Sequence, residues 1–340
     1  MQVFDASEAR ERRPSMALVW TALLAVWIVW GSTYLAIRVG VRTIPPLLMA
    51  SARFLVAGTI LYLIVRRRDP RRLSSQHWRS AFLIGGALLL GGNGLVSIAE
   101  QSVPSGIAAL IIASVPLFLA SGDRVFFGKR LSWVAVVGLV VGFAGVALLV
   151  GQSVGGRFDL GGMLLLIGAS ISWASGSLYA RAAPQPDNPV LGAAMQMMAG
   201  SLILVVVAGL TGEFARLDLG GISLESFLGL VYLIVFGSWV GFVAYVWLLK
   251  HVSVSLVGTY AYVNPVVAVL LGWAILGEAV TARTLVAGGI VIIGVALIVA
   301  AREPKPLAGD PAGAKPPVRH RLSLRRSRRV HRSDRSLASR

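Results

Sequence analysis

The stretch from Ser132 to Val150 reads SWVAVVGLVVGFAGVALLV and holds no charged side chain over its 19 residues. A helix needs about 20 apolar residues to cross the hydrocarbon core of a bilayer. Similar stretches recur along the 340-residue chain, at 16–37, 46–65, 80–99, 104–122, 160–182, 189–210, 226–248, 255–276 and 284–300. They are continuous rather than alternating, which argues against barrel strands. The sequence therefore predicts an all-α integral membrane protein with ten transmembrane helices.

The composition excludes several classes of protein. Hydrophobic residues make up 56% of the chain and charged residues 14%, whereas a soluble domain has about 25% charged residues. The chain has no cysteine, so it has no disulfide, no Cys-ligated zinc and no iron–sulfur cluster. Its four histidines are scattered, at His77, His251, His320 and His331. We expect neither a soluble enzyme nor a metal or other cofactor.

Lys and Arg are divided unequally between the loops that connect the predicted helices. With the N-terminus inside, the inner segments before the C-terminal tail hold 14 of these residues and the outer loops hold 5. Cytoplasmic loops carry such an excess, so we expect both termini in the cytoplasm and a multi-pass location in the inner (plasma) membrane. The run 16–37 is not a cleaved signal peptide, because it is too long and no A-x-A site follows it.

The C-terminal segment 302–340 is basic and rich in proline, with 12 Lys/Arg against 3 Asp/Glu. Such a composition cannot bury a core and predicts disorder. The segment would lie beside the inner leaflet, where anionic lipid attracts each basic residue by about 1 kcal/mol. It lacks aromatic residues that could stack on bases, so we expect no nucleic-acid partner. Either contact with anionic lipid or a plain solvated tail fits this segment.

The chain contains an internal repeat. An offset of 149 aligns residues 99–150 with 248–299 without a gap, and an offset of 143 aligns the earlier helices. The aligned pairs include Pro116 with Pro265, Gly128 with Gly277, Trp30 with Trp173, Arg38 with Arg181 and Arg53 with Gln196. Each half holds five predicted helices, an odd number, so the second half must insert upside down. Inverted repeats are typical of transporters whose substrate site lies at the midplane.

This organisation predicts five segments along the chain. They are a cytoplasmic N-terminal segment 1–15, a first five-helix repeat 16–150, a periplasmic linker 151–159, a second five-helix repeat 160–301 and the cytoplasmic tail 302–340.

Several short motifs fall in register with these repeats. They are Trp30-Gly31-Ser32-Thr33, Arg53-Phe54, Pro116, Gly128-Lys129-Arg130-Leu131-Ser132, Pro265 and Leu276-Gly277-Glu278. Together they make residues 16–301 resemble the EamA family of the drug/metabolite transporter superfamily. The resemblance implies ten helices around a central cavity, alternating access, and export of small metabolites, amino acids or drugs. Two departures are Lys129, where the family commonly has Glu, and Asp123-Arg124, where apolar residues are expected.

Arg53 is the one cation placed well inside a predicted helix. A lone charge at such a depth costs at least about 2.5–3.5 kcal/mol, so a partner or a watery cavity must offset it. We expect Arg53 to face the cavity, where it either holds an anionic group of the substrate or pairs with Glu100. A structural role, with the side chain extended toward the interface, is the alternative.

Other polar and aromatic residues in the predicted helices are candidates for binding substrate. Aromatic rings can stack on an organic or cationic substrate, although most such residues pack against lipid or other helices. With Arg53, the predicted substrate-binding residues are Trp30, Thr33, Asn93, Ser97, Trp173, Gln196, Tyr245, Tyr260 and Asn264.

Glu100 is the candidate for carrying a proton, and a solvated glutamate at the interface is the alternative reading. Pro116 and Pro265 are predicted helix kinks, because proline removes a backbone donor.

These observations predict a secondary transporter, and more specifically an exporter of small organic metabolites that works by alternating access. A lipid flippase on the same scaffold is the alternative. A membrane-embedded lipid-modifying enzyme is disfavoured, because Asp123 alone is too few carboxylates for a metal pair. Gly138-x-x-x-Gly142 permits close helix packing, so we interpret 132–150 and 284–300 as scaffold. A homodimer through this face stays open.

Overall fold

The computed structural model describes residues 15–69, 71–128, 130–151, 159–252 and 254–301. Within these ranges the regular structure is entirely helical. The elements are α1 (Met16–Gly40), α2 (Pro46–Arg68), α3 (Ser75–Gly85), η1 (Gly86–Gly94), α4 (Leu95–Ala99), α5 (Ser105–Ile112), α6 (Val115–Phe127), α7 (Trp133–Val150), α8 (Leu160–Ala180), α9 (Pro189–Leu210), α10 (Glu213–Arg216), α11 (Leu224–Tyr232), η2 (Leu233–Val240), α12 (Gly241–His251), α13 (Val254–Val257), α14 (Tyr260–Leu276) and α15 (Ala282–Ala301).

Nine helical segments of the described chain are long and apolar enough to cross a membrane. Consecutive elements form several of them, such as Ser75–Ala99 from α3, η1 and α4, and Ser105–Phe127 from α5 and α6. The predicted span 255–276 corresponds to the short α13 followed by α14, which is a shorter apolar helix of 17 residues. The described chain is therefore an all-helical integral membrane protein, as predicted, and the tenth crossing stays a prediction.

The helices begin and end where the local chemistry requires. Ser132 starts α7 by accepting a hydrogen bond from the Ala135 N–H at 3.2 Å, which satisfies one of the free donors of the first turn. Gly128 and Gly277 end α6 and α14 with φ of 62° and 66°. Glycine adopts this left-handed conformation without steric cost. The aligned glycines thus have the same role in each half of the chain.

The two prolines predicted as kinks lie in different local structures. Pro116 lies in the first turn of α6, directly after an interruption at Ala113 and Ser114. Pro265 lies inside α14, whose helix continues through it. The break near α14 falls instead at Gly258 and Thr259, before the helix starts.

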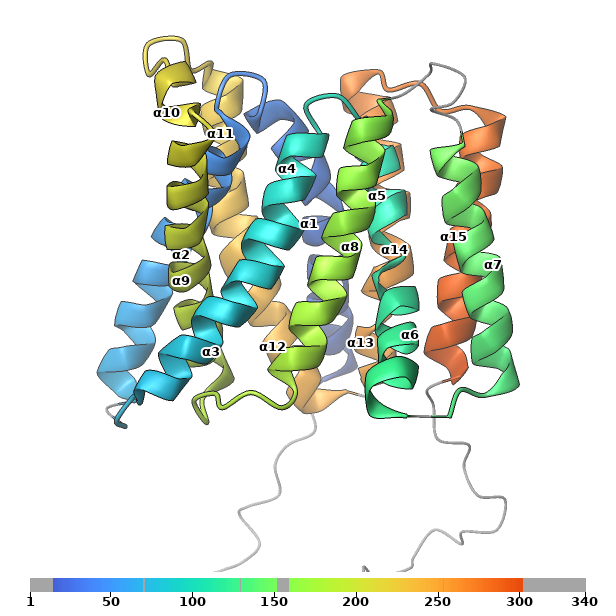
Figure 1. Ribbon diagram of the computed structural model, residues 1–340, viewed down its shortest axis with the longest axis horizontal. Coiled ribbons are helices and arrows are strands. Elements are labelled where there is room, and N and C mark those ends of the chain that lie inside the picture. The colour runs from blue at the N-terminus through green and yellow to red at the C-terminus, as the bar shows by residue number, and fades with distance from the viewer. Residues whose placement is uncertain (1–14, 70, 129, 152–158, 253, 302–340) are drawn as a thin grey trace, which may run out of the picture. The chain divides into compact units, whose positions relative to one another are not determined.

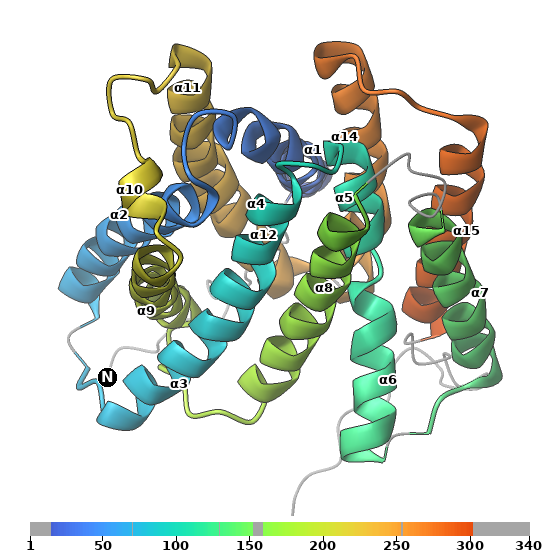
Figure 2. The same cartoon turned by 45° about the horizontal axis from the view of Figure 1, so that its top comes forward.

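The closest helix packing joins the first half of the chain to the second. In Figures 1 and 2, α7 lies beside α15, α2 beside α9, and α1 beside α14. Glycines allow the α7–α15 approach: a Cβ added at Gly294 would collide with the backbone of Gly142, and one at Gly138 would lie 2.8 Å from the Gly294 carbonyl oxygen. Such small residues let two helix backbones come together in lipid.

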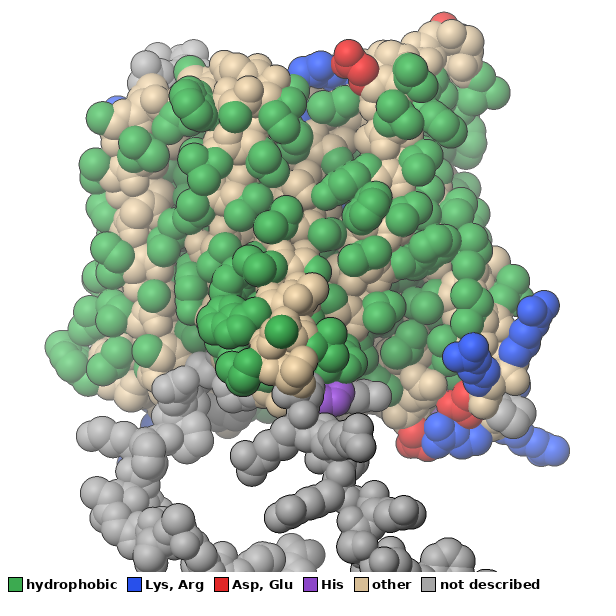
Figure 3. Space-filling model, turned by 180° about the vertical axis from the view of Figure 1, so that it is seen from behind, with side chains coloured by type: hydrophobic (Ala, Val, Ile, Leu, Met, Phe, Trp, Pro, Cys, Tyr) green, Lys and Arg blue, Asp and Glu red, His purple; other side chains and the backbone are tan. Residues whose placement is uncertain are grey.

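The outer surface of the helices is apolar. Figure 3 shows hydrophobic side chains over the middle of one face, with Lys, Arg, Asp and Glu near its two ends. The exposed large side chains include Trp20 on α1, Leu202 and Val206 on α9, and Leu270 on α14. A soluble protein does not expose so extended an apolar surface, so this surface faces lipid.

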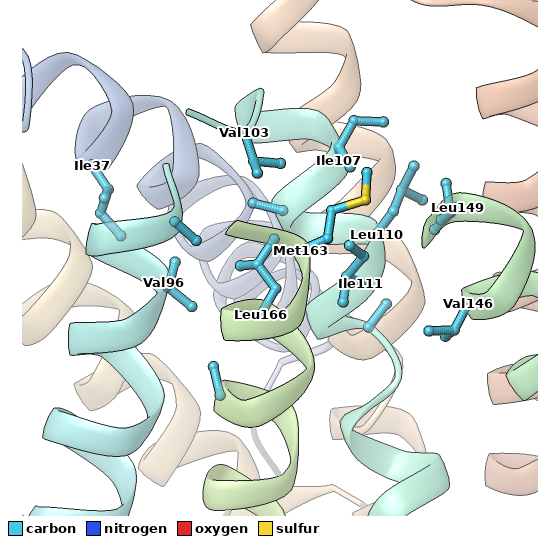
Figure 4. Close-up of a cluster of buried hydrophobic side chains, with 14 of the residues drawn as sticks. Ile37, Val96, Val103, Ile107, Leu110, Ile111, Val146, Leu149, Met163 and Leu166 are labelled. Atoms are coloured by element: carbon cyan, nitrogen blue, oxygen red, sulfur yellow. The ribbon is translucent and has the colours of Figure 1, made fainter. Parts of the chain in front are cut away.

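A buried apolar cluster joins α1, α4, α5, α7 and α8. Figure 4 shows Val96, Val103, Ile107, Met163 and Leu166 directed into this cluster. Val103, Met163 and Leu166 are fully buried. Glu100 lies between Val96 and Val103 and is itself fully buried, whereas Gln101 and Ser102, which follow it, are exposed.

Candidate functional site

Three aromatic rings from distant parts of the chain gather between α1, α12 and α14. The ring of Trp30 lies 5.1 Å from that of Tyr245 and 5.2 Å from that of Tyr260, centroid to centroid. The two tyrosine rings are 5.9 Å apart and nearly perpendicular. All three side chains are only partly buried. The cluster is therefore an aromatic wall against which an organic molecule can pack.

The same wall adjoins the π-helical segment η2 at Gly237. The Trp30 indole N–H donates to the Gly237 carbonyl oxygen at 3.2 Å. A Cβ at Gly237 would come within 2.9 Å of the Arg53 Nη2 atom and 3.0 Å of the Thr33 methyl carbon. A side chain at Gly237 would therefore crowd Arg53 and Thr33. π-helical segments are rare and often mark functional sites.

Arg53 is buried, with 7% of its surface exposed. Its Nε atom donates to the Ser238 hydroxyl at 3.0 Å, and its guanidinium carbon lies 4.7 Å from the centre of the Phe54 ring. Among the described residues Arg53 forms no ion pair. Pairing with Glu100, one expectation from sequence, is not found, because both Glu100 carboxylate oxygens lack a hydrogen-bond partner. The Arg53 charge thus contacts only neutral groups.

Asn264 adjoins the aromatic wall from α14. With its amide nitrogen turned toward them, it donates to the carbonyl oxygens of Trp27 at 3.1 Å and Tyr260 at 3.2 Å. The structure therefore places Asn264 next to Trp27 and to Tyr260 of the aromatic wall.

A second group of predicted residues lies around the other π-helical segment, η1. Asn93 donates to the Leu88 carbonyl oxygen at 3.3 Å, and the Ser97 hydroxyl donates to the Asn93 carbonyl oxygen at 2.9 Å. Trp173 on α8 packs so closely on η1 that a Cβ at Gly92 would lie 2.6 Å from its ring. Gln196 is apart from both groups, because its amide donates to Gln185 in the loop before α9 at 2.9 Å.

Glu100 lies directly after the apolar segment Ser75–Ala99 and is fully buried. Arg38 donates to its backbone carbonyl oxygen, while both of its carboxylate oxygens are without a partner. Burial raises the pKa of the Glu100 carboxyl well above its usual range; the nearby Glu278 raises it further and Arg38 opposes the shift. The reading of Glu100 as a solvated interfacial glutamate does not hold.

The opposite end of the bundle holds an ion pair between α6 and α8. Arg181 Nη1 lies 2.7 Å from Asp123 Oδ1, and the Asp123 side chain is 11% exposed. Asp123 is one of the two departures from the family pattern seen in the sequence. The ion pair with Arg181 accounts for this charge. It joins α6, which lies in the fourth predicted helix of the first half, to the end of α8, the first helix of the second half.

A small cleft near the loop before α3 is polar. Arg71 binds Asp69 at 2.8 Å and Asp187 at 2.7 Å, and His77 and Gln185 also line the cleft. The hydrogen bond from Arg71 holds the pKa of the Asp69 carboxyl below its usual value. Arg71 and Asp187 are exposed and Asp69 is nearly buried, and these three charged groups are paired with one another.

The sequence of the chain matches the profile of the EamA-like transporter family twice, over residues 17–151 and 160–300. The chain belongs to the EamA-like transporter family. It is 42% identical over 282 residues to an Escherichia coli protein named as the uncharacterized inner membrane transporter YedA, covering 82% of this chain and 89% of that one. It is 27% identical over 285 residues to a probable terminal-alkyne amino-acid exporter of Streptantibioticus cattleyicolor, covering 82% and 92%.

A solved crystal structure shares the fold of this EamA protein, with a TM-score of 0.56 and 20% sequence identity, covering 84% of this chain and 97% of that one. Family and relatives make the EamA chain a multi-pass inner membrane transporter, and their names point to transporters rather than enzymes. Within the described ranges no cluster of three or more His, Cys, Asp or Glu could hold a metal ion.

Sequence reasoning missed Gly237 and Ser238, which complete the surroundings of Trp30 and Arg53. They appear in the sequence only as a small pair within an apolar run. Nothing in that local pattern shows that Arg53, 185 residues away, contacts Ser238.

Proposed function

We propose that this EamA protein is a secondary transporter that exports small organic metabolites, such as amino acids or drugs, by alternating access. The observation that carries the proposal is Arg53, a buried cation within a membrane-crossing helix whose described partners are all neutral. Burying such a charge costs free energy, and charged residues that are nevertheless kept inside a membrane typically mark a functional site. An anionic group of a substrate would supply the missing countercharge.

The aromatic wall supports an organic substrate with an apolar part. Trp30, Tyr245 and Tyr260 present ring faces and edges, and Arg53 lies close to Gly237, whose carbonyl oxygen binds Trp30. A molecule with a carboxylate and an apolar side chain matches both features, since a guanidinium binds a carboxylate bidentately. The name of the S. cattleyicolor relative, an amino-acid exporter, is consistent with this class.

Alternating access rests on two inverted five-helix repeats, 16–150 and 160–301, with ten crossings and both termini cytoplasmic. Three observations support this part of the proposal. The family profile matches each half separately. The third predicted helix of each half contains a π-helical segment, η1 or η2. Helices of one half pack mainly on helices of the other, so two similar units can rock about one site.

The test is counterflow of a labelled amino-acid mixture in liposomes that contain the purified protein. Native protein is expected to show saturable exchange, and Arg53→Ala to abolish it. Arg53→Lys keeps the charge but cannot form a bidentate contact, so a higher KM is expected. Retained exchange with unchanged affinity in Arg53→Lys would refute direct binding by Arg53.

The role of the aromatic wall can be tested in the same assay with a matched control variant. Trp30→Phe removes the indole N–H that binds Gly237 and is expected to weaken substrate affinity. Trp78→Phe makes the same chemical change on α3, where the ring packs with Tyr62 at 6.0 Å, and is expected to leave exchange unchanged. An equal loss in both variants would refute a specific role of Trp30.

The partners follow from the same proposal. The substrate is a small molecule, and the bilayer surrounds the apolar face. Contact of the basic tail 302–340 with anionic lipid concerns residues outside the described ranges. Scrambling of labelled lipid without exchange of any metabolite would favour the flippase alternative.

A further inference from the structure

Glu100 differs from every other buried glutamate in the described chain. Glu213 and Glu278 are also buried or partly buried, but each accepts two backbone N–H groups: Glu213 from Leu47 and Leu48, and Glu278 from Ser105 and Gly106. Their negative charges thus stabilise the first turns of α2 and α5. Glu100 has the same side chain, is fully buried, and has no partner on either oxygen.

The surroundings of Glu100 do not compensate for an ionised carboxylate. From α1, Arg38 contacts its backbone carbonyl rather than its carboxylate, and the Tyr34 hydroxyl lies near it. From the segment after α14, the Glu278 carboxylate faces it with the same charge.

The other charged groups on neighbouring elements are already occupied. Asp159, before α8, accepts from the Ser102 hydroxyl, and Arg53 on α2 binds Ser238. A buried, unpaired carboxylate is strongly disfavoured relative to its neutral form.

Packing around Glu100 shows what exposure would require. Ala99 and Val103 are fully buried, and Val103 points into the apolar cluster between α4, α5 and α8 (Figure 4). Gln101 and Ser102, which follow Glu100, are exposed, but the Glu100 side chain itself is not, so hydration of the carboxyl requires a separation of the side chains packed around it. Such a separation is the outer opening that alternating access demands, so the inference rests on the proposed function.

We propose that Glu100 is a proton-binding site whose occupancy is linked to closure of the outer end of the protein. In the closed conformation the carboxyl holds one proton. When the outer end opens, water hydrates the carboxyl, which releases that proton to the outer solution as a hydrated proton and becomes a carboxylate. Closure takes one proton back.

The sign of the pH effect follows from this linkage. The closed conformation binds the proton more tightly, so a fall in pH favours closure and a rise favours opening. In the window between the ordinary glutamate pKa, about 4.3, and the raised value of the closed state, the open-to-closed ratio changes up to tenfold per pH unit.

Because the chain contains no cysteine, opening can be measured with a single introduced thiol. Val103→Cys places it at a fully buried position beside Glu100. The rate of its reaction with a membrane-impermeant thiol reagent, added from outside to sealed vesicles, reports opening. Reactivity of the thiol itself depends on pH, so each rate is divided by that of the same thiol in a Glu100→Gln background.

With Glu100 present, this relative rate is expected to rise with pH, up to tenfold per unit. Glutamine resembles the neutral carboxyl, so Glu100→Gln is expected to stay closed and label slowly at every pH. Glu213→Gln is the matched control: it also removes a buried outer carboxylate, but one with partners, and the pH dependence is expected to persist. Equal pH profiles with and without Glu100, or loss of the pH dependence in Glu213→Gln, would overturn the proposal.

Infrared difference spectra between low and high pH supply a second measurement. Other carboxyls also contribute to the protonated-carboxyl band, so the spectrum of Glu100→Gln is subtracted from that of the native protein. A remaining band that shifts in glutamate-labelled protein is expected, and identical spectra in the two proteins would overturn the proposal. The proposed transport function fails separately, if native protein shows no counterflow of any substrate.

Discussion

Removal of the Asp123 charge is expected to favour opening of the inner end of the helix bundle without unfolding the protein. The Asp123–Arg181 pair joins α6 to α8, and its oxygen–nitrogen distance is 2.7 Å. The carboxylate side chain is 11% exposed and the guanidinium side chain 43% exposed. Under the proposed alternating access, opening of this end separates α6 from α8, so the pair stabilises the closed form of what we propose to be the inner end.

The size of the effect follows from the geometry of the pair. Two unit charges about 4 Å apart attract by about 4 kcal/mol at an effective dielectric constant of 20, but desolvation offsets much of this. Hydrogen bonds to charged groups contribute about 1.5–3 kcal/mol net. The half-exposed Arg181 regains water when the pair breaks, so the lower end of that range applies. The open-to-closed ratio should therefore rise about tenfold.

The assay uses Leu178→Cys, a buried position on α8 that packs on Gly122 of α6. In inside-out vesicles, Asp123→Asn is expected to label about tenfold faster than native protein at this thiol. Asp187→Asn is the matched control, because it breaks an inner ion pair whose carboxylate is 82% exposed. It is expected to leave the rate unchanged. An unchanged rate in Asp123→Asn, or an equal acceleration in the control, would refute the reasoning.

Three further substitutions test packing, capping and the surroundings of the buried cation. Gly294→Ala places a Cβ against the backbone of α7 and is expected to lower the free energy of unfolding by about 1–3 kcal/mol. A lower melting temperature in detergent would show this loss. The control is Gly289→Ala, whose Cβ meets nothing within 4 Å, so its melting temperature should be unchanged. Glu213→Gln weakens the cap of α2 and is expected to lower the free energy of unfolding by about 1 kcal/mol, which the same melting experiment would detect. Ser238→Ala removes the neutral partner of Arg53 and is expected to change the KM of exchange; an unchanged KM would place the Arg53–Ser238 contact outside the substrate path.

Long apolar runs made the helices predictable, because hydrocarbon leaves no other solution for the backbone. The interruptions were less predictable. Two aligned prolines suggested equivalent kinks, yet Pro116 begins α6 and Pro265 lies within α14. A proline in the first turn of a helix removes a donor that has no intrahelical partner. The same residue is therefore compatible with a break in one half and with a continuous helix in the other.

The composition of the site could be predicted better than its contacts. Arg53 and the aromatic residues stand out in apolar segments, so the sequence identified them. The electrostatic surroundings of Glu100 include Arg38 and Glu278, which are far away in the chain and approach only through folding. Local sequence shows how deep a side chain lies along a helix, but not which distant groups surround it.

Under the proposed alternating access, the divergence of the two halves at Arg38 and Arg181 means that the two ends close by different chemistry. Arg181 binds a carboxylate, whereas Arg38 donates to a backbone carbonyl beside a carboxyl without a partner. Salt screens a partly exposed ion pair, while closure around a neutral carboxyl has no such charge pair to screen. Raising the salt concentration should therefore accelerate labelling at Leu178→Cys more than at Val103→Cys. Equal acceleration at both thiols would contradict this difference, because the two ends would then respond alike.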